Sequence, residues 1–233
     1  RLPMARVAVD LLGGDEGAPV VADAIAAVLA GETDGRTAGS TPQSIQICVV
    51  GPRDLARDLL AERGIDADAH GDITIAHAQE SVPMFSSSHD TLDMLRERQD
   101  LSSLVGVEEL RSGRADAFVS IGHTGATVGA SAFGLGRVRG MGRPGLAVEL
   151  PTAHGPVILL DCGAAPHATA EDLVRFAAVG ASYARIVGID SPRIGLLSIG
   201  GERGKVITCA SRRIFASPRS FRRSTWVQSR ATT

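Results

Sequence analysis

Short apolar segments alternate with longer amphipathic segments along most of the chain. The apolar segments predict β-strands at residues 7–10, 45–50, 73–77, 117–121, 146–150, 157–161 and 193–199. The segments between them predict helices at residues 20–30, 53–63, 103–111, 124–136 and 170–187, and a loop that runs into a helix at 86–101. Residues 32–44, rich in Gly, Thr and Ser, predict a loop. Wholly apolar strands alternating with helices favour an α/β fold, a three-layer α/β/α sandwich around a mostly parallel sheet.

The composition agrees with this fold and indicates the cellular compartment of the protein. The chain has 233 residues, of which 44% are hydrophobic and 21% charged, which excludes wholesale disorder. Aromatic residues make up only 3%, so the core has to consist of aliphatic side chains. Three cysteines are too few for a disulfide framework and favour a reducing compartment. We therefore expect a cytoplasmic protein. The N-terminus lacks the apolar stretch of a signal peptide.

Charge is distributed unevenly, although the formal net charge is only −2. Acidic residues outnumber basic ones before residue 203, whereas residues 203–233 contain basic residues and no acidic ones. The acidic body gives no reason to expect nucleic acid as a partner. No linker is evident before residue 203.

Candidate chemistry lies in four glycine-rich turns that follow predicted strands, at residues 10–19, 120–126, 161–166 and 199–205. Carboxyl ends of parallel strands share one edge of a sheet, and glycine lets backbone N–H groups approach an anion closely. The turns therefore predict an anion site. Neither a dinucleotide fingerprint nor a P-loop is present, and the histidines and cysteines lack metal-ligand spacing. Among the histidines, His123 is the candidate for ligand contact. Asp10 and Asp161 either cap neighbouring N–H groups or act in the site.

Several of these motifs occur together, and in the same order, in one known family. The matching stretches are residues 7–10, 13–15, 18–19, 115–120, 122, 124–126, 143–144, 150–152, 159–161, 163–164, 171–174, 180 and 192–197. The chain from residue 4 to about 205 resembles the bacterial phosphate acyltransferases of phospholipid synthesis. The resemblance implies transfer of a fatty acyl group from acyl-[acyl carrier protein] to inorganic phosphate, which yields acyl-phosphate. It also implies a homodimer, peripheral membrane contact, and no cofactor or metal.

The resemblance assigns site residues in all four turns. Phosphate and substrate binding falls to Gly13, Gly14, Asp15, Gly122, His123, Thr124, Gly125, Asp161, Gly163 and Ala164. Catalytic roles fall to Lys205, as a positive clamp on phosphate, and to Asp10, which orients the turns. Lys205 is the one lysine in the sequence.

The sequence also departs from the family pattern. Glu16 and His123 stand where the family usually has His and Asn, and Ala165 and Pro166 replace its Asn-Val turn. After Lys205 the expected strands and helices do not follow. We therefore expect an incomplete α/β domain at 4–205 and an aberrant tail at 206–233, the alternative being a genuine basic tail. Three other functional interpretations stay open: an inactive truncated remnant, a phosphate acetyltransferase-like enzyme, and a dehydrogenase-like enzyme.

Overall fold

The computed structural model describes residues 4–31, 45–153, 155–162 and 168–197. The chain divides into two compact units, a first unit that ends at Gly136 and a second unit that begins at Arg137. Each unit is described by itself.

A parallel sheet forms the centre of the first unit. Its strands within the described residues are β1 (Ala5–Asp10), β2 (Ile45–Gly51), β3 (Ile73–His77) and β4 (Ala117–Val119), in the order β3-β2-β1-β4. All three pairings are parallel. The chain adds β2 and β3 on one side of β1 and then returns to place β4 on the other side. The strand order thus reverses between β1 and β4, and in open α/β sheets ligands bind at such a point, outside the carboxyl ends of the strands.

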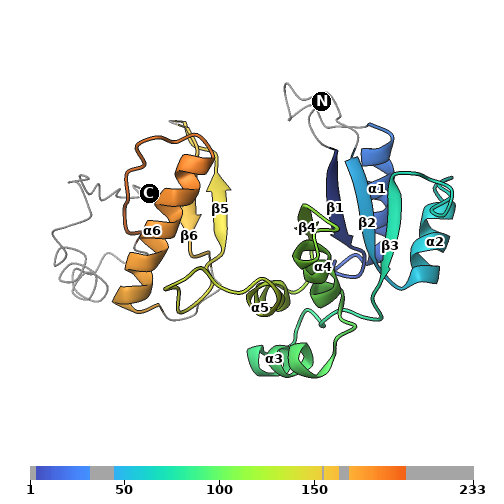
Figure 1. The fold of residues 1–233 in the computed structure, drawn as a ribbon, viewed down its shortest axis with the longest axis horizontal. Helices are drawn as coiled ribbons and strands as arrows, with labels where there is room; N and C mark the ends of the chain where they lie inside the picture. Colours follow the sequence, from blue (N-terminus) through green and yellow to red (C-terminus); the bar gives the residue numbers. More distant parts are fainter. Residues whose placement is uncertain (1–3, 32–44, 154, 163–167, 198–233) are drawn as a thin grey trace. The chain divides into compact units, whose positions relative to one another are not determined.

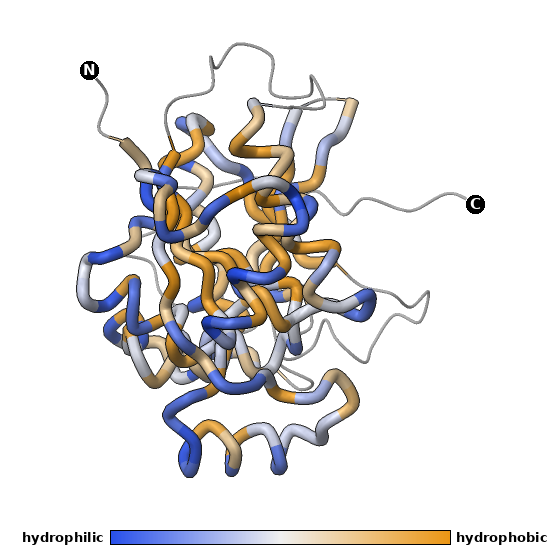
Figure 2. Tube along the Cα trace, turned by 90° about the vertical axis from the view of Figure 1, so that its right-hand side faces the viewer, coloured by the Kyte–Doolittle hydropathy of each residue, from blue (hydrophilic) through white to orange (hydrophobic). Residues whose placement is uncertain are grey.

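Helices cover both faces of this sheet (Figure 1). The helices α1 (Ala18–Leu29) and α2 (Arg53–Ala61) pack on one face, where Ile47 and Val49 of β2 belong to their core cluster. The helix α4 (Ser102–Arg111) packs on the opposite face with Cys48 and Val50. Side chains alternate across a strand, so an apolar run such as β2 supplies both layers. The predicted three-layer arrangement is confirmed in this unit, and Figure 2 shows how hydrophobic and hydrophilic stretches alternate along the chain.

Two further helices complete the first unit. The helix α5 (Thr124–Gly134) packs on α4, and α3 (Ser88–Glu97) packs on α5, with a core cluster that includes Leu95, Val107, Ala126 and Ala130. Small residues permit the close approach, since a Cβ at Gly134 would lie 2.4 Å from Val107 Cγ1. The glycine- and alanine-rich sequence of α5 is therefore explained by packing. None of the helices in the described residues is long and apolar enough to cross a membrane.

The second unit contains a hairpin and a helix. The strands β5 (Ala147–Leu150) and β6 (Val157–Leu160) pair antiparallel, and α6 (Ala170–Ile186) packs against β6. The connection between the two strands is too short for the crossover that a parallel pair requires. Helix α6 begins with a capping box, in which Thr169 and Asp172 each bind the other's backbone N–H.

The last predicted strand, at residues 193–199, is wrong over its described part. Residues 193–197 have no regular structure, and Leu197 is 68% exposed. A strand needs a neighbouring strand to satisfy its backbone hydrogen bonds, and no described strand pairs with these residues. Residues 198–199 and the predicted loop at 32–44 lie outside the described residues.

Candidate functional site

The turns that follow β1 and β4 touch backbone to backbone at the point where the strand order reverses. A Cβ at Gly13 would lie 2.6 Å from the backbone N and 2.8 Å from the Cα of Gly122. A Cβ at Gly122 would lie 3.0 Å from the Cα of Gly13. Neither position has room for a side chain, so we call this pair the glycine contact. Gly14 adjoins it, since a Cβ there would lie 2.6 Å from Ile121 Cδ1.

A buried carboxylate holds the two turns together. Asp10 ends β1 and is only 2% exposed. Its Oδ1 accepts a hydrogen bond from the Leu12 N–H at 3.1 Å, and its Oδ2 accepts one from Ser120 Oγ at 2.8 Å. Ser120 Oγ in turn accepts a hydrogen bond from the Gly122 N–H at 3.1 Å. We call this chain of hydrogen bonds the Asp10–Ser120 bridge. Asp10 therefore caps a neighbouring N–H group, which is the first of the two roles that the sequence left open for it.

Sequence reasoning did not single out Ser120. The residue follows an apolar strand and lies two positions before Gly122, which is common in turns. Its significance comes from the pairing of β1 with β4, in which Val9 lies opposite Val119. That register places Asp10 beside Ser120 although they are 110 positions apart in the sequence. Only a predicted pairing of these two strands could have revealed the contact.

His123 occupies the N-cap of α5 and uses both ring nitrogens. Its Nδ1 accepts a hydrogen bond from the Ala126 N–H at 3.1 Å. Its Nε2 lies 3.2 Å from the Ser86 carbonyl oxygen. The two residues that follow, Thr124 and Gly125, open α5, and N–H groups in the first turn of a helix have no partner within the helix. These N–H groups, together with the positive end of the helix dipole, favour an anion.

The predicted site residues are only partly brought together. Asp10, Gly13, Gly14, Gly122 and His123 meet at the two turns, and Thr124 and Gly125 continue into α5. Asp15 is exposed in the first turn and forms no hydrogen bond or ion pair with any described residue.

The other predicted site residues do not belong to the described first unit. Asp161 lies in the second unit, where its Oδ1 accepts a hydrogen bond from the Leu146 N–H at 3.0 Å. Gly163, Ala164 and Lys205 lie outside the described residues. It stays a prediction that these four residues belong to the same site as the two turns of the first unit.

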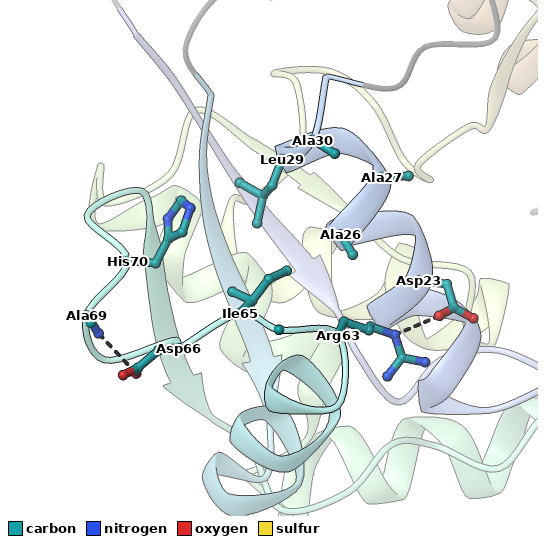
Figure 3. Close-up of a pocket in the computed structure, with 11 residues that line it drawn as sticks. Asp23, Ala26, Ala27, Leu29, Ala30, Arg63, Ile65, Asp66, Ala69 and His70 are labelled. Carbon is teal, nitrogen blue, oxygen red and sulfur yellow. Dashed lines mark hydrogen bonds and ion pairs between the residues drawn. The ribbon is translucent and has the colours of Figure 1, made fainter.

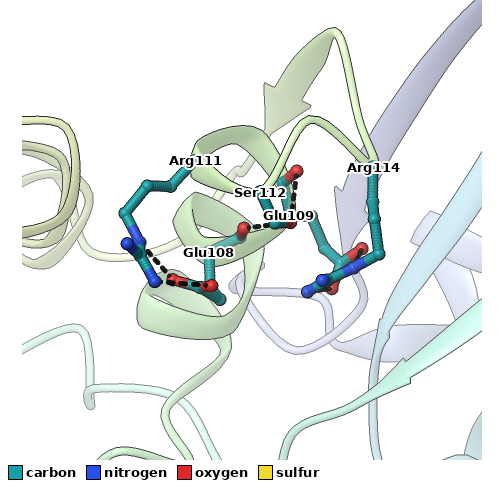
Figure 4. A network of polar contacts seen from close by, with 5 residues as sticks. All are labelled: Glu108, Glu109, Arg111, Ser112 and Arg114. Carbon is teal, nitrogen blue, oxygen red and sulfur yellow. Dashed lines mark hydrogen bonds and ion pairs between the residues drawn. The ribbon is translucent and has the colours of Figure 1, made fainter.

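Two cavities in the described part of the first unit lie away from the glycine contact. One of about 670 Å³ is an open hollow lined by the end of α1 and the segment before β3, at the amino edge of the sheet (Figure 3). The other, of about 700 Å³, is lined by β3, α3, α4 and α5. At its side, Arg111 and Arg114 each form two hydrogen bonds to a glutamate of α4, Glu108 and Glu109 respectively (Figure 4). The candidate anion site therefore rests on N–H groups at the reversal point and not on a deep cavity.

Arg63 lines the first cavity and connects α1 to α2 through several hydrogen bonds, which leads to a prediction about stability. Arg63 is 17% exposed, and it donates to Asp23 Oδ1 at 2.6 Å and to the carbonyl oxygens of Leu59 and Pro19 at 2.6 and 3.0 Å. We expect Arg63→Lys to lower the free energy of unfolding by about 1–2 kcal/mol, because an ammonium does not reproduce the fork of a guanidinium. Urea denaturation measures the change.

The matched control is Arg57→Lys. Arg57 forms an ion pair with Asp68 in which the two side chains are 41% and 65% exposed. Exposed pairs contribute little, so this variant should change the free energy of unfolding by under about 0.5 kcal/mol. Equal effects of the two variants would show that the hydrogen bonds of Arg63 contribute nothing.

Several carboxyl groups make the protein sensitive to acid. Hydrogen bonds from the guanidinium of Arg6 hold the pKa of Asp116 below its usual value, and Arg98 and Arg111 do the same for Asp100 and Glu108. In α6, the Thr169 hydroxyl lowers the pKa of Asp172. A carboxyl whose pKa is lower in the folded state contributes stability above its unfolded pKa. That stability is lost as the pH falls through the folded pKa.

We therefore expect the free energy of unfolding to fall as the pH drops below about 4, near the unfolded pKa of aspartate. Asp116→Asn should make this fall shallower, because one fewer carboxyl has to be protonated. Urea denaturation between pH 7 and pH 2.5 measures the slope. Asp58→Asn, at an exposed carboxyl without an ion pair among the described residues, is the control, and an equal slope change there would refute the expectation.

The fold and the reversal point together define an α/β protein with a candidate anion site. A solved structure of similar fold is EutD phosphotransacetylase from Staphylococcus aureus, with a TM-score of 0.56 over 89% of this chain and 62% of that chain. The sequence identity is 19%, so this likeness concerns the fold alone.

Sequence comparison identifies the family. Residues 5–223 match the family described as fatty acid synthesis protein, and the chain belongs to this family. It is 38% identical over 200 residues to a phosphate acyltransferase of Thermus thermophilus, which covers 86% of this chain and 55% of the relative. A phosphate acyltransferase of Geotalea uraniireducens is 39% identical over 204 residues, covering 86% of this chain and 53% of the relative. The resemblance drawn from the motifs is thus confirmed.

The extent of the match bears on the ends of the domain. The chain spans about half the length of the curated relatives it matches. The family match runs to residue 223, beyond Lys205 and into the stretch expected to be an aberrant tail. The division into a domain at 4–205 and a tail at 206–233 stays a prediction.

Proposed function

We propose that this protein belongs to the machinery that transfers a fatty acyl group from acyl-[acyl carrier protein] to inorganic phosphate. The observation that carries the proposal is the glycine contact, which sets the first N–H groups of α5 beside the reversal point of the sheet. The relatives named phosphate acyltransferase support it.

The reaction needs a bound phosphate and a stabilised oxyanion. A phosphate oxygen attacks the thioester carbonyl carbon, and the C–O bond forms as the carbonyl oxygen becomes an oxyanion. Collapse of this tetrahedral intermediate breaks the C–S bond, and the released thiolate takes up a proton. Fixed N–H donors stabilise the charge that develops on oxygen, and the loss of one such donor typically costs about 3–4 kcal/mol in the barrier. The acyl group passes from sulfur to oxygen without a change of oxidation state, so the reaction needs no oxidant or reductant.

The chain's own residues divide these tasks. The N–H groups of residues 123–125 bind phosphate, the Gly122 N–H is held by Ser120 Oγ, and the N–H groups of Gly163 and Ala164 complete the site. Asp10 is buried and fixes the turns by accepting hydrogen bonds from the Leu12 N–H and the Ser120 hydroxyl. Lys205 neutralises the phosphate. A cytoplasmic location, a homodimer and peripheral membrane contact belong to the same proposal, since the resemblance implies the last two and the few cysteines favour the first.

The test is direct. The purified chain is incubated with a long-chain acyl-[acyl carrier protein] and phosphate, and acyl-phosphate is trapped with hydroxylamine while free thiol is titrated. We expect both products to depend on phosphate. The full-length Thermus thermophilus relative serves as the positive control. Products from the relative alone would identify this chain as an inactive remnant, and products only with an acetyl thioester would favour a phosphate acetyltransferase.

Lys205 is tested in the same assay. We expect Lys205→Ala to abolish acyl-phosphate formation, because the phosphate would lose its positive clamp. Arg57→Ala, which removes a cation on the exposed side of α2, is the control. Unchanged turnover of Lys205→Ala would remove this residue from the site.

A further inference from the structure

The loop that leads from β3 to α3 is attached to both turns of the candidate site. Near its start, Ser81 Oγ donates a hydrogen bond to the Leu12 carbonyl oxygen at 3.3 Å. Near its end, the Ser86 carbonyl oxygen lies 3.2 Å from His123 Nε2. The loop therefore runs along the reversal point, from the turn after β1 to the turn after β4.

Between these attachments the loop carries two apolar side chains on its surface. A tight turn brings the Ser86 N–H to the Pro83 carbonyl oxygen at 3.0 Å. Met84 is 40% exposed in this turn, and Phe85 is 100% exposed. A phenylalanine ring wholly in water is unusual, because burial of its apolar surface is favourable. Phe85 thus stands unburied next to the N-terminus of α5.

The partners of His123 fix its tautomer. A backbone N–H only donates and a carbonyl oxygen only accepts, so Nδ1 is the acceptor and Nε2 carries the proton. The ring is therefore a rigid connection between the first turn of α5 and the Pro83–Ser86 turn. A side chain at residue 125 would disturb it, since a Cβ there would lie 2.9 Å from the Cε1 of His123. With both nitrogens engaged, the ring has no free nitrogen for phosphate.

We propose that His123 is a positioning residue, which holds the Pro83–Ser86 turn so that Phe85 forms an apolar wall for the acyl chain of the donor. The inference rests on the proposed function, because the fatty acyl chain is the apolar group that the reaction brings to this edge. It replaces the expectation that the His123 side chain binds phosphate. Phe85 thereby becomes a residue that determines acyl-chain specificity.

Two substitutions separate the functions of the ring nitrogens. In His123→Asn the amide oxygen reaches the place of Nδ1, so the cap of α5 remains and the bond to Ser86 is lost. In His123→Gln the amide nitrogen reaches the place of Nε2, so the bond to Ser86 remains and the cap is lost. Thermal unfolding shows that each variant is folded before further measurements.

Proteolysis tests the connection independently of activity. Chymotrypsin cleaves after phenylalanine, and mass spectrometry quantifies cleavage of the Phe85–Ser86 bond alone. We expect cleavage at least about tenfold faster in His123→Asn than in the wild-type chain, because local opening of the turn exposes the bond to the protease. His123→Gln should stay within about twofold of the wild type, since its turn is still held. Equal rates in His123→Asn and the wild type would overturn the role of His123.

Kinetics test the wall for the acyl chain. With a long-chain donor, His123→Asn and Phe85→Ala should both raise the KM for the donor about tenfold, whereas the KM for phosphate should change less than about twofold. The effect should shrink as the acyl chain is shortened. Asp58→Asn, at a remote exposed position, is the control. A raised KM for phosphate in His123→Asn would return His123 to the phosphate site and overturn the proposal.

The two proposals fail in different ways. Acyl transfer by the full-length relative and not by the wild-type chain would refute the proposed function, and with it the wall for the acyl chain. The proteolysis experiment would still decide whether His123 holds the turn. If acyl transfer occurs but the effect of Phe85→Ala on the KM for the donor is the same for long and short acyl chains, only the proposal of an apolar wall is refuted.

Discussion

Replacing Gly13 with alanine is expected to lower the free energy of unfolding by about 3 kcal/mol, at the upper end of the usual cost of overpacking. The new methyl group would lie 2.6 Å from the backbone N and 2.8 Å from the Cα of Gly122. Both atoms belong to the backbone, so no flexible side chain can move aside. The turns after β1 and β4 must separate instead, which stretches the Asp10–Ser120 bridge.

The matched control for this substitution is Gly71→Ala. A Cβ at Gly71 would meet nothing within 4 Å, so we expect a change of under about 0.5 kcal/mol. Urea denaturation measures both variants, and the acyl-phosphate assay should show loss of turnover only for Gly13→Ala. Equal stability of the two variants would mean that the turns do not touch in solution.

Helices and strands were predictable from the sequence where the signal for an element lies within the element itself. The predicted range 73–77 is that of β3, and the predicted helix at 170–187 differs from α6 by one residue at its end. The sequence carries these signals because apolar periodicity and a capping box are local. The antiparallel pairing of β5 and β6 was missed, since an apolar run does not reveal the direction of its partner. The strand expected at 193–199 has no described partner over residues 193–197.

The site was predictable in its glycines and not in its hydrogen bonds. Gly13 and Gly122 stood out because glycine lets N–H groups approach an anion, and the structure shows that the two residues touch each other, while their contact with an anion stays a prediction. Ser120 could not be found in this way, because its role depends on the register between β1 and β4. His123 was expected to contact phosphate, and sequence alone cannot show that the Ala126 N–H and the Ser86 carbonyl oxygen engage its ring.

The Asp10–Ser120 bridge gives the second large effect. Asp10→Ala removes the acceptor of the Leu12 N–H and of the Ser120 hydroxyl. A buried donor without a partner costs about 1–3 kcal/mol, so we expect a loss of about 3 kcal/mol in the free energy of unfolding. Ser120→Ala leaves the buried Oδ2 of Asp10 without its donor and should cost about 2 kcal/mol. Both variants release the Gly122 N–H from its fixed position and should abolish acyl transfer.

A double-mutant cycle decides whether the two side chains act as one unit. If they do, Asp10→Ala combined with Ser120→Ala should cost less than the sum of the single changes, with a coupling of about 1–2 kcal/mol. Ser120→Thr keeps the hydroxyl and should restore most of the stability. Ser88→Ala, at an exposed serine in the first turn of α3, is the control and should change stability by under about 0.5 kcal/mol. Additive losses in the cycle would show that Asp10 and Ser120 stabilise the two turns independently, and that the turn after β4 does not depend on the carboxylate at the end of β1.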